Sequence, residues 1–264
     1  MRPPTLAPVL FLRTTLFFVR SFGYGFYFDD RTQVLEGKLI REPSAVGKIF
    51  SSAVWTNVDE RRGEEDTRLD TYRPLFNLSL WADYQKGRLS SWTFHSTNVA
   101  LHAAVVTLLF CVLVAMGVPN GGAVFGAGLF ALHPIAATPI HYVSARADSL
   151  AACFSLLAVL AWIRNRAFAP AAYLAALLCK ETALLLPLTW PLFRRPLSRK
   201  EWIGWAWGWA AALLSYAALR RAALGRAKAV EGADHLLRAV ANVPRALGHF
   251  LRQTVDPSRA FPLV

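Results

Sequence analysis

The stretch that decides the fold covers residues 89–145 and reads LSSWTFHSTNVALHAAVVTLLFCVLVAMGVPNGGAVFGAGLFALHPIAATPIHYVSA. Its 57 consecutive residues include no Asp, Glu, Lys or Arg. One helix needs about 20 predominantly apolar residues to cross a bilayer, so this stretch is long enough for two crossings joined by a tight turn at GVPNGG. The sequence therefore predicts a polytopic, all-α transmembrane helical bundle.

Further apolar runs lie on both sides of this stretch. The segment 167–193 is unusual because Lys180 and Glu181 stand at its middle. Broken helices are tolerated at membrane depth where they line a polar cavity, so we predict two half-helices with these two charges at their shared tip. The bundle is then expected to have about seven membrane segments: 8–28, 92–116, 120–140, 149–163, the two halves of 167–193, and 202–219.

The charges indicate how the bundle is oriented. The net charge is +12, but Arg164, Arg166 and the basic residues of 194–200 fall at segment ends, a pattern typical of cytoplasmic loops and not of a nucleic-acid-binding surface. Residues 29–91 hold 11 of the 17 acidic residues and are predicted to form one large polar loop on the outer side. We expect a membrane domain over residues 1–220 and a basic, partly helical tail over 221–264, the start of a further loop.

Two adjacent carboxylates, Asp29 and Asp30, follow the first apolar run. Acidic side chains near a membrane span are costly unless they serve a substrate, a proton or a metal, although a hydrated helix end explains them equally well. Lys180 and Glu181 are predicted to mark a site for an anionic headgroup, with Lys180 as the phosphate contact, and a structural ion pair is the alternative. Arg73 lies in the outer region, just before the second segment.

Two other sets of polar residues complete the candidate site. His133 precedes a proline that breaks a segment, and Arg146 and Asp148 begin the next one; Arg is suited to bidentate phosphate binding. His95 and His102 share one face of a helix with Asn98, where contact with a cavity and packing between helices are both open. Taken singly, His133, Arg146 and Asp148 are each better explained by a structural role.

The ordered set of an acidic pair, YRPL, FHSTNVALH, ALHP, ARADSLA and KETALLLPL resembles the GT-C membrane glycosyltransferases. It looks closest to the O-mannosyltransferase branch that carries tetratricopeptide repeats, and to bacterial relatives. The resemblance extends from about residue 22 to the tail, although no 34-residue helical repeat follows. It implies transfer of a mannose-like hexose from a polyprenyl-phosphate donor to a protein or glycan hydroxyl on the outer face.

The resemblance also assigns roles to the candidate residues. It makes Asp29, Asp30 and Asp148 catalytic, with one of the pair as the general base toward the acceptor hydroxyl. The residues expected to bind the donor phosphate are Arg146, Lys180 and Arg73. The residues expected to support the site are His133, Glu181, His95 and His102. Some members of this superfamily hold a divalent metal on such acids, which here would be the three aspartates, and others do not.

The alternative is a truncated or inactive, non-enzymatic membrane protein that binds lipid headgroups or a partner subunit. It predicts that the acidic residues are dispersed. The high content of Ala, Leu and Arg favours a bacterial inner membrane over the endoplasmic reticulum.

Overall fold

A computed structural model describes residues 3–54, 71–193 and 198–224, together with the single residues 248 and 252. These residues form helices and short helical turns, with no strand in the described part. In chain order the elements are α1 Pro3–Phe17, η1 Val19–Gly23, η2 Arg31–Leu35, η3 Leu39–Arg41, α2 Val46–Phe50, α3 Pro74–Gly87, α4 Ser91–Ala115, α5 Asn120–Leu132, α6 Pro134–His141, α7 Arg146–Ile163, α8 Ala169–Cys179, η7 Glu181–Phe193 and α9 Arg199–Leu224. The prediction of an all-helical chain is confirmed for this part.

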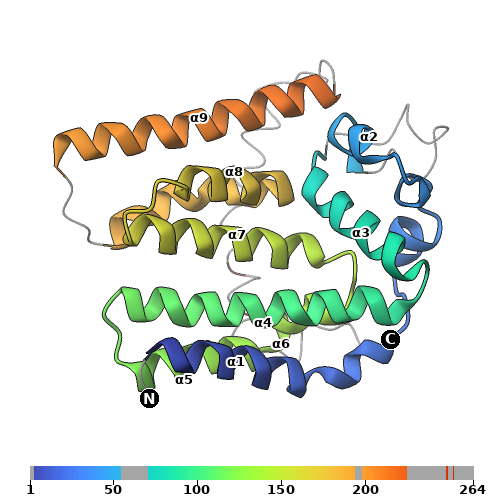
Figure 1. Cartoon of the computed structure of the whole chain (residues 1–264), viewed down its shortest axis with the longest axis horizontal. Helices are drawn as coiled ribbons and strands as arrows, with labels where there is room; N and C mark the ends of the chain where they lie inside the picture. The colour runs from blue at the N-terminus through green and yellow to red at the C-terminus, as the bar shows by residue number, and fades with distance from the viewer. Residues whose placement is uncertain (1–2, 55–70, 194–197, 225–247, 249–251, 253–264) are drawn as a thin grey trace.

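The long helices lie roughly parallel in layers, with α7 in the centre (Figure 1). α7 packs on α4 on one side and on α8 on the other, while α1 and α5 cover the far side of α4, and α9 covers α8. One apolar core, which includes Trp162, Tyr173 and Trp209, joins α7, α8 and α9. A second core, centred on Val106 and Phe110 of α4, joins α4 to α1 and α5.

The number of spans is smaller than expected. Within the described residues, two helices are long and apolar enough to cross a membrane, α4 and α7, or three if α5 and α6 count as one span bent by 52°. That bend occurs at Pro134, which lacks the N–H that would continue α5. α1 and α8 are shorter apolar helices, and the tryptophans and glycines of α9 lower its hydropathy, so a bundle of about seven spans is not confirmed.

The broken segment at 167–193 is confirmed. α8 ends at Cys179, Lys180 is extended with φ −160° and ψ 137°, and η7 begins at Glu181. Both α8 and η7 pack against α7, so they form a hairpin whose tip, Lys180 and Glu181, lies near the start of α7.

The region predicted as a polar outer loop is largely helical where it is described. α3 lies at the end of the bundle where α7 begins (Figure 1). The turns before it pack on its surface, with Leu39 and Ile49 against Leu78 and Trp81. Residues 55–70 lie outside the described part, and so does the predicted tail beyond α9 apart from residues 248 and 252, so the division into a domain at 1–220 and a tail at 221–264 stays a prediction.

Candidate functional site

Asp30 has a structural role, because its carboxylate joins two segments of the chain. Its side chain is completely buried. Its Oδ1 accepts a hydrogen bond from the Ser144 amide at 2.7 Å, and its Oδ2 accepts from the amides of Val143 at 3.1 Å and Tyr27 at 3.3 Å. Asp30 therefore fastens the segment after α1 to the loop that leads into α7.

Asp29 differs from its neighbour because it is exposed. It follows Phe28, whose φ of 47° is in the left-handed region, which is rare for a bulky residue. The loop is held on either side by Asp30 and by His95, whose Nε2 lies 3.0 Å from the Gly25 carbonyl oxygen. Of the two adjacent carboxylates, only Asp29 is free to meet a substrate.

Asp148 and Lys180 form the second part of the site. Asp148 lies in the first turn of α7, and its Oδ1 accepts a hydrogen bond from Lys180 Nζ at 2.5 Å. The Lys180 side chain is 22% exposed and that of Asp148 is 54% exposed. The carboxylate end of this pair is therefore open, whereas the lysine end is largely covered by protein.

Arg73 and Glu181 form the third part. Arg73 Nε and Nη2 donate to Glu181 Oε2 at 3.0 Å and to Oε1 at 2.9 Å, which makes a bidentate pair. These two hydrogen bonds hold Glu181, and with it the neighbouring Lys180, against the start of α3.

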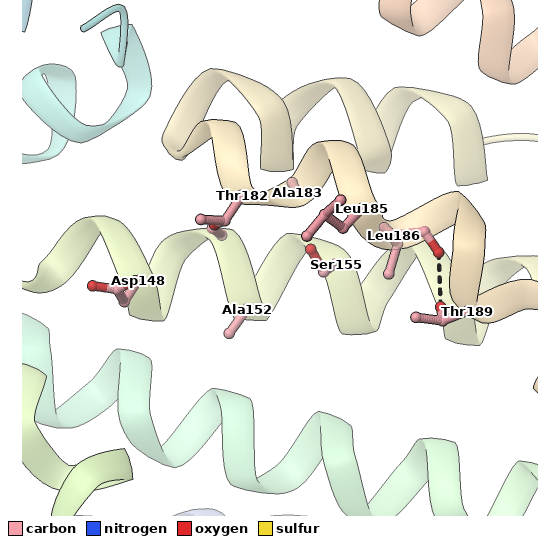
Figure 2. A pocket seen from close by; sticks show the side chains of 9 residues that line it. Asp148, Ala152, Ser155, Thr182, Ala183, Leu185, Leu186 and Thr189 are labelled. Carbon is pink, nitrogen blue, oxygen red and sulfur yellow. Dashed lines mark hydrogen bonds between the residues drawn. The ribbon is translucent and has the colours of Figure 1, made fainter. Parts of the chain in front are cut away.

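A cavity of about 310 Å³ opens between α7 and η7, and Asp148 is its only charged lining residue. Asp148 stands at one end and Thr189 at the other (Figure 2). The wall between them is mostly apolar, formed by Ala151, Ala152, Ala183, Leu185 and Leu186, with hydroxyls from Ser155 and Thr182. It is an apolar groove that ends beside an ammonium group.

Arg146 does not point into this groove. Its side chain is completely buried, with Nη2 2.7 Å from Asp83 Oδ2 and Nε donating to Asn98 Oδ1 at 2.5 Å. Nη2 and Nη1 also donate to the backbone oxygens of Phe94 at 2.8 Å and Ser79 at 3.2 Å. Because all three guanidinium nitrogens have partners within the protein, the geometry does not support the predicted phosphate contact, and Arg146 instead joins α3, α4 and α7.

His95, Asn98 and His102 form a polar stripe on α4, and this stripe faces the bent pair of helices α5 and α6. Asn98 Nδ2 donates to the Pro139 and Tyr142 carbonyls at 2.6 and 3.2 Å, while ring nitrogens of His95 and His102 lie 2.9 and 3.0 Å from the carbonyls of Ile140 and Ala131. The last four carbonyls of a helix have no partner within it, and such groups are costly in a bilayer. The stripe thus satisfies the ends of α5 and α6, which supports the packing alternative for His95 and His102.

His133 has a local role and the metal hypothesis finds no support. His133 Nδ1 accepts from the Ile135 amide at 3.3 Å and so caps the start of α6. In the described residues, no three Asp, Glu, His or Cys side chains gather in an arrangement that could hold a metal ion. Both carboxylate oxygens of Asp30 accept hydrogen bonds from backbone amides, and Asp148 pairs with Lys180. The three aspartates therefore do not fit a shared metal.

Asp83 is an important residue that the sequence interpretation missed. It is 2% exposed and also accepts a hydrogen bond from Thr97 Oγ1 at 2.8 Å. Its signal in the sequence is weak, because it is a single acidic residue two positions after Trp81 in a helix without a clear polar face. The backbone amides that bind Asp30 carry no signal at all.

Comparison with known proteins identifies relatives of this chain. No protein family model and no solved structure matches it. It is 30% identical to human "Protein O-mannosyl-transferase TMTC3" over 143 residues and 31% identical to human "Protein O-mannosyl-transferase TMTC2" over 149 residues. It is also 31% identical to Drosophila melanogaster "Protein O-mannosyl-transferase Tmtc2" over 205 residues, or 72% of this chain.

The match covers only part of these relatives. The two human alignments take in 54% and 56% of this chain, and the three alignments take in 15%, 17% and 21% of the relatives' own lengths. The chain therefore corresponds to a minor part of each relative. Within that part, the TMTC protein O-mannosyl-transferases are homologues of this chain.

Proposed function

We propose that this chain is the membrane-embedded part of a glycosyltransferase that moves a mannose-like hexose from a polyprenyl-phosphate donor to a protein hydroxyl. The observation that carries the proposal is the apolar groove between α7 and η7 that ends at Asp148, whose carboxylate accepts a hydrogen bond from Lys180. An isoprenoid chain needs an apolar wall, and its phosphate needs a cation beside that wall. The names of the relatives support transfer of mannose to protein.

The residues would act as follows. Asp29 accepts the proton of the acceptor hydroxyl while the hydroxyl oxygen forms a bond to the anomeric carbon. The bond between that carbon and the phosphate oxygen breaks, and polyprenyl phosphate leaves with the electron pair. Lys180 releases Asp148 and neutralises the charge that develops on the leaving phosphate. Asp30 keeps Asp29 in place through the Val143 and Ser144 amides.

The proposal needs the two parts of the site to lie close together, and the contacts support this. The amide of Ser144 binds Asp30, and Asp148 follows four residues later on the same turn into α7. The acids are thus gathered at one end of the bundle, which we call the site end. This favours the enzyme over a non-enzymatic headgroup binder, for which dispersed acids are expected. We also propose the polyprenyl-phosphate donor, a site on the outer face, and a location in a bacterial inner membrane.

The test is transfer by the full chain in lipid vesicles, from radiolabelled polyprenyl-phosphate mannose to an acceptor protein. We expect Asp29→Asn to lower the rate by about 10²–10⁴-fold, because it removes the base. Lys180→Gln should lower it by about 10²-fold or more, because the phosphate loses its cation. Glu36→Gln changes an exposed acid of the same outer region and serves as the matched control.

If Asp29→Asn transfers sugar as fast as the wild type, the assigned mechanism is wrong. If the wild type retains polyprenyl phosphate through Lys180 yet transfers no sugar, the chain is a headgroup-binding protein.

A further inference from the structure

We infer that α3 is a positioning clamp, in which Arg73 holds the hairpin tip that carries Lys180 and Asp83 holds the first turn of α7 that carries Asp148. This inference rests on the proposed function for its catalytic meaning. It concerns residues that touch neither the groove nor Asp29.

The first arm of the clamp is the pair of Arg73 with Glu181. The two residues are 108 positions apart in sequence and are joined by two hydrogen bonds, which fix orientation as well as distance. Arg73 is itself held, since the preceding Tyr72 is buried and its hydroxyl donates to the Phe50 carbonyl at 2.8 Å. The fixed end therefore belongs to α3, and Glu181 transmits its position to the neighbouring Lys180.

The second arm is the pair of Asp83 with Arg146. Both side chains are buried, 2% and 0% exposed, and their closest atoms lie 2.7 Å apart. Arg146 is two residues before Asp148 and two residues after Ser144, whose amide binds Asp30. The second arm thus fixes the turn on which both acids depend.

The two arms are connected by one rigid element. Arg73 and Asp83 are ten residues apart, which corresponds to about 15 Å along a helix. Between them, Phe76 and Leu80 are buried in the core shared with α7. Misplacement of a reacting group by 1 Å can cost about 10²-fold in rate, so a helix that fixes both sides of the site has a direct effect on transfer.

A charge reversal separates this role from the phosphate contact that the sequence predicts for Arg73. In the vesicle assay with polyprenyl-phosphate mannose, Arg73→Glu and Glu181→Arg should each lower kcat at least tenfold. The double variant, which restores the pair in reverse, should return kcat to within about threefold of the wild type. If the double variant stays as slow as Arg73→Glu, Arg73 contacts the donor itself and the first arm of the clamp is wrong.

Hydrogen–deuterium exchange tests both arms of the clamp without a measurement of sugar transfer. Arg73→Gln should speed exchange of the Lys180 and Ala183 amides at the hairpin tip, whereas Asp83→Asn should speed exchange of the Arg146 and Asp148 amides. Asp83→Glu, which keeps the buried charge, replaces Asp83→Asn if that variant does not fold. Lys48→Gln breaks the exposed Lys48–Glu42 pair of the outer region and should change neither segment.

The two measurements can fail independently. If neither segment exchanges faster in its variant, α3 is not a clamp, whatever the wild type transfers. If the expected exchange pattern appears but the wild type transfers no sugar, the clamp stands and the proposed function is wrong.

Discussion

At the scale of single residues, Asp29 and Asp30 are chemically identical neighbours with opposite environments. Asp30 is buried and accepts three backbone hydrogen bonds, whereas Asp29 is exposed at the end of a strained turn. A buried amide that loses its acceptor costs about 1–3 kcal/mol. The pair therefore divides into one residue that supports the loop and one that is available for chemistry.

This division predicts separate effects of two alanine substitutions. Asp30→Ala should lower the free energy of unfolding by about 1–3 kcal/mol, since the amides of Val143 and Ser144 lose their acceptor. Asp29→Ala should change it by no more than about 0.5 kcal/mol, as at an ordinary surface position. Thermal unfolding in detergent measures both, and equal destabilisation by the two substitutions would contradict the division.

At the scale of elements, the broken segments are the informative ones. The charges of Lys180 and Glu181 within an apolar run were sufficient to predict the hairpin of α8 and η7, and Pro134 was sufficient to predict a break in the segment 120–140. The sequence did not indicate what satisfies the polar groups at that break. In the structure, the polar stripe of α4 does so, which explains why a membrane helix carries Asn98 and two histidines.

The contact between α8 and α9 depends on one glycine. A Cβ at Gly208 would lie 2.8 Å from Pro170 Cγ, whereas a Cβ at Gly204 would meet nothing within 4 Å. Gly208→Val should therefore cost about 1–3 kcal/mol of stability by overpacking, and Gly204→Val should cost much less. Thermal unfolding of the two variants in detergent is the measurement, and equal destabilisation by the two substitutions would contradict the role given to Gly208.

At the scale of the whole molecule, the two ends of the bundle have different chemistry. Asp30, Arg73, Asp148 and Lys180 lie at the site end. Arg164 follows the opposite end of α7, where α9 also begins (Figure 1). The orientation predicted from the basic residues, in which the site end faces outward, stays a prediction.

The orientation can be measured by labelling with a maleimide that does not cross membranes. In sealed cells, a cysteine introduced by Glu36→Cys should be labelled from outside, and one introduced by Arg166→Cys should be labelled only after permeabilisation. Both positions are exposed in the structure. The wild type gives the background, because Cys179 is buried and Cys111 and Cys153 are partly buried. Labelling of Arg166→Cys in sealed cells would reverse the orientation.

The sequence by itself determined that this chain is a helical membrane protein, where one helix pair folds back, and which superfamily it resembles. The first two properties follow from hydropathy and charge along the chain, which act locally, and the resemblance rests on the ordered set of motifs. Only the tertiary structure decided that Asp29 is the exposed acid, that Arg146 is buried on Asp83, and that Arg73 binds Glu181. Those outcomes join residues about 110 positions apart, such as Arg73 with Glu181 and Asp30 with Val143, and they depend on how helices pack. A spacing rule cannot report which of two adjacent aspartates meets backbone amides and which meets water.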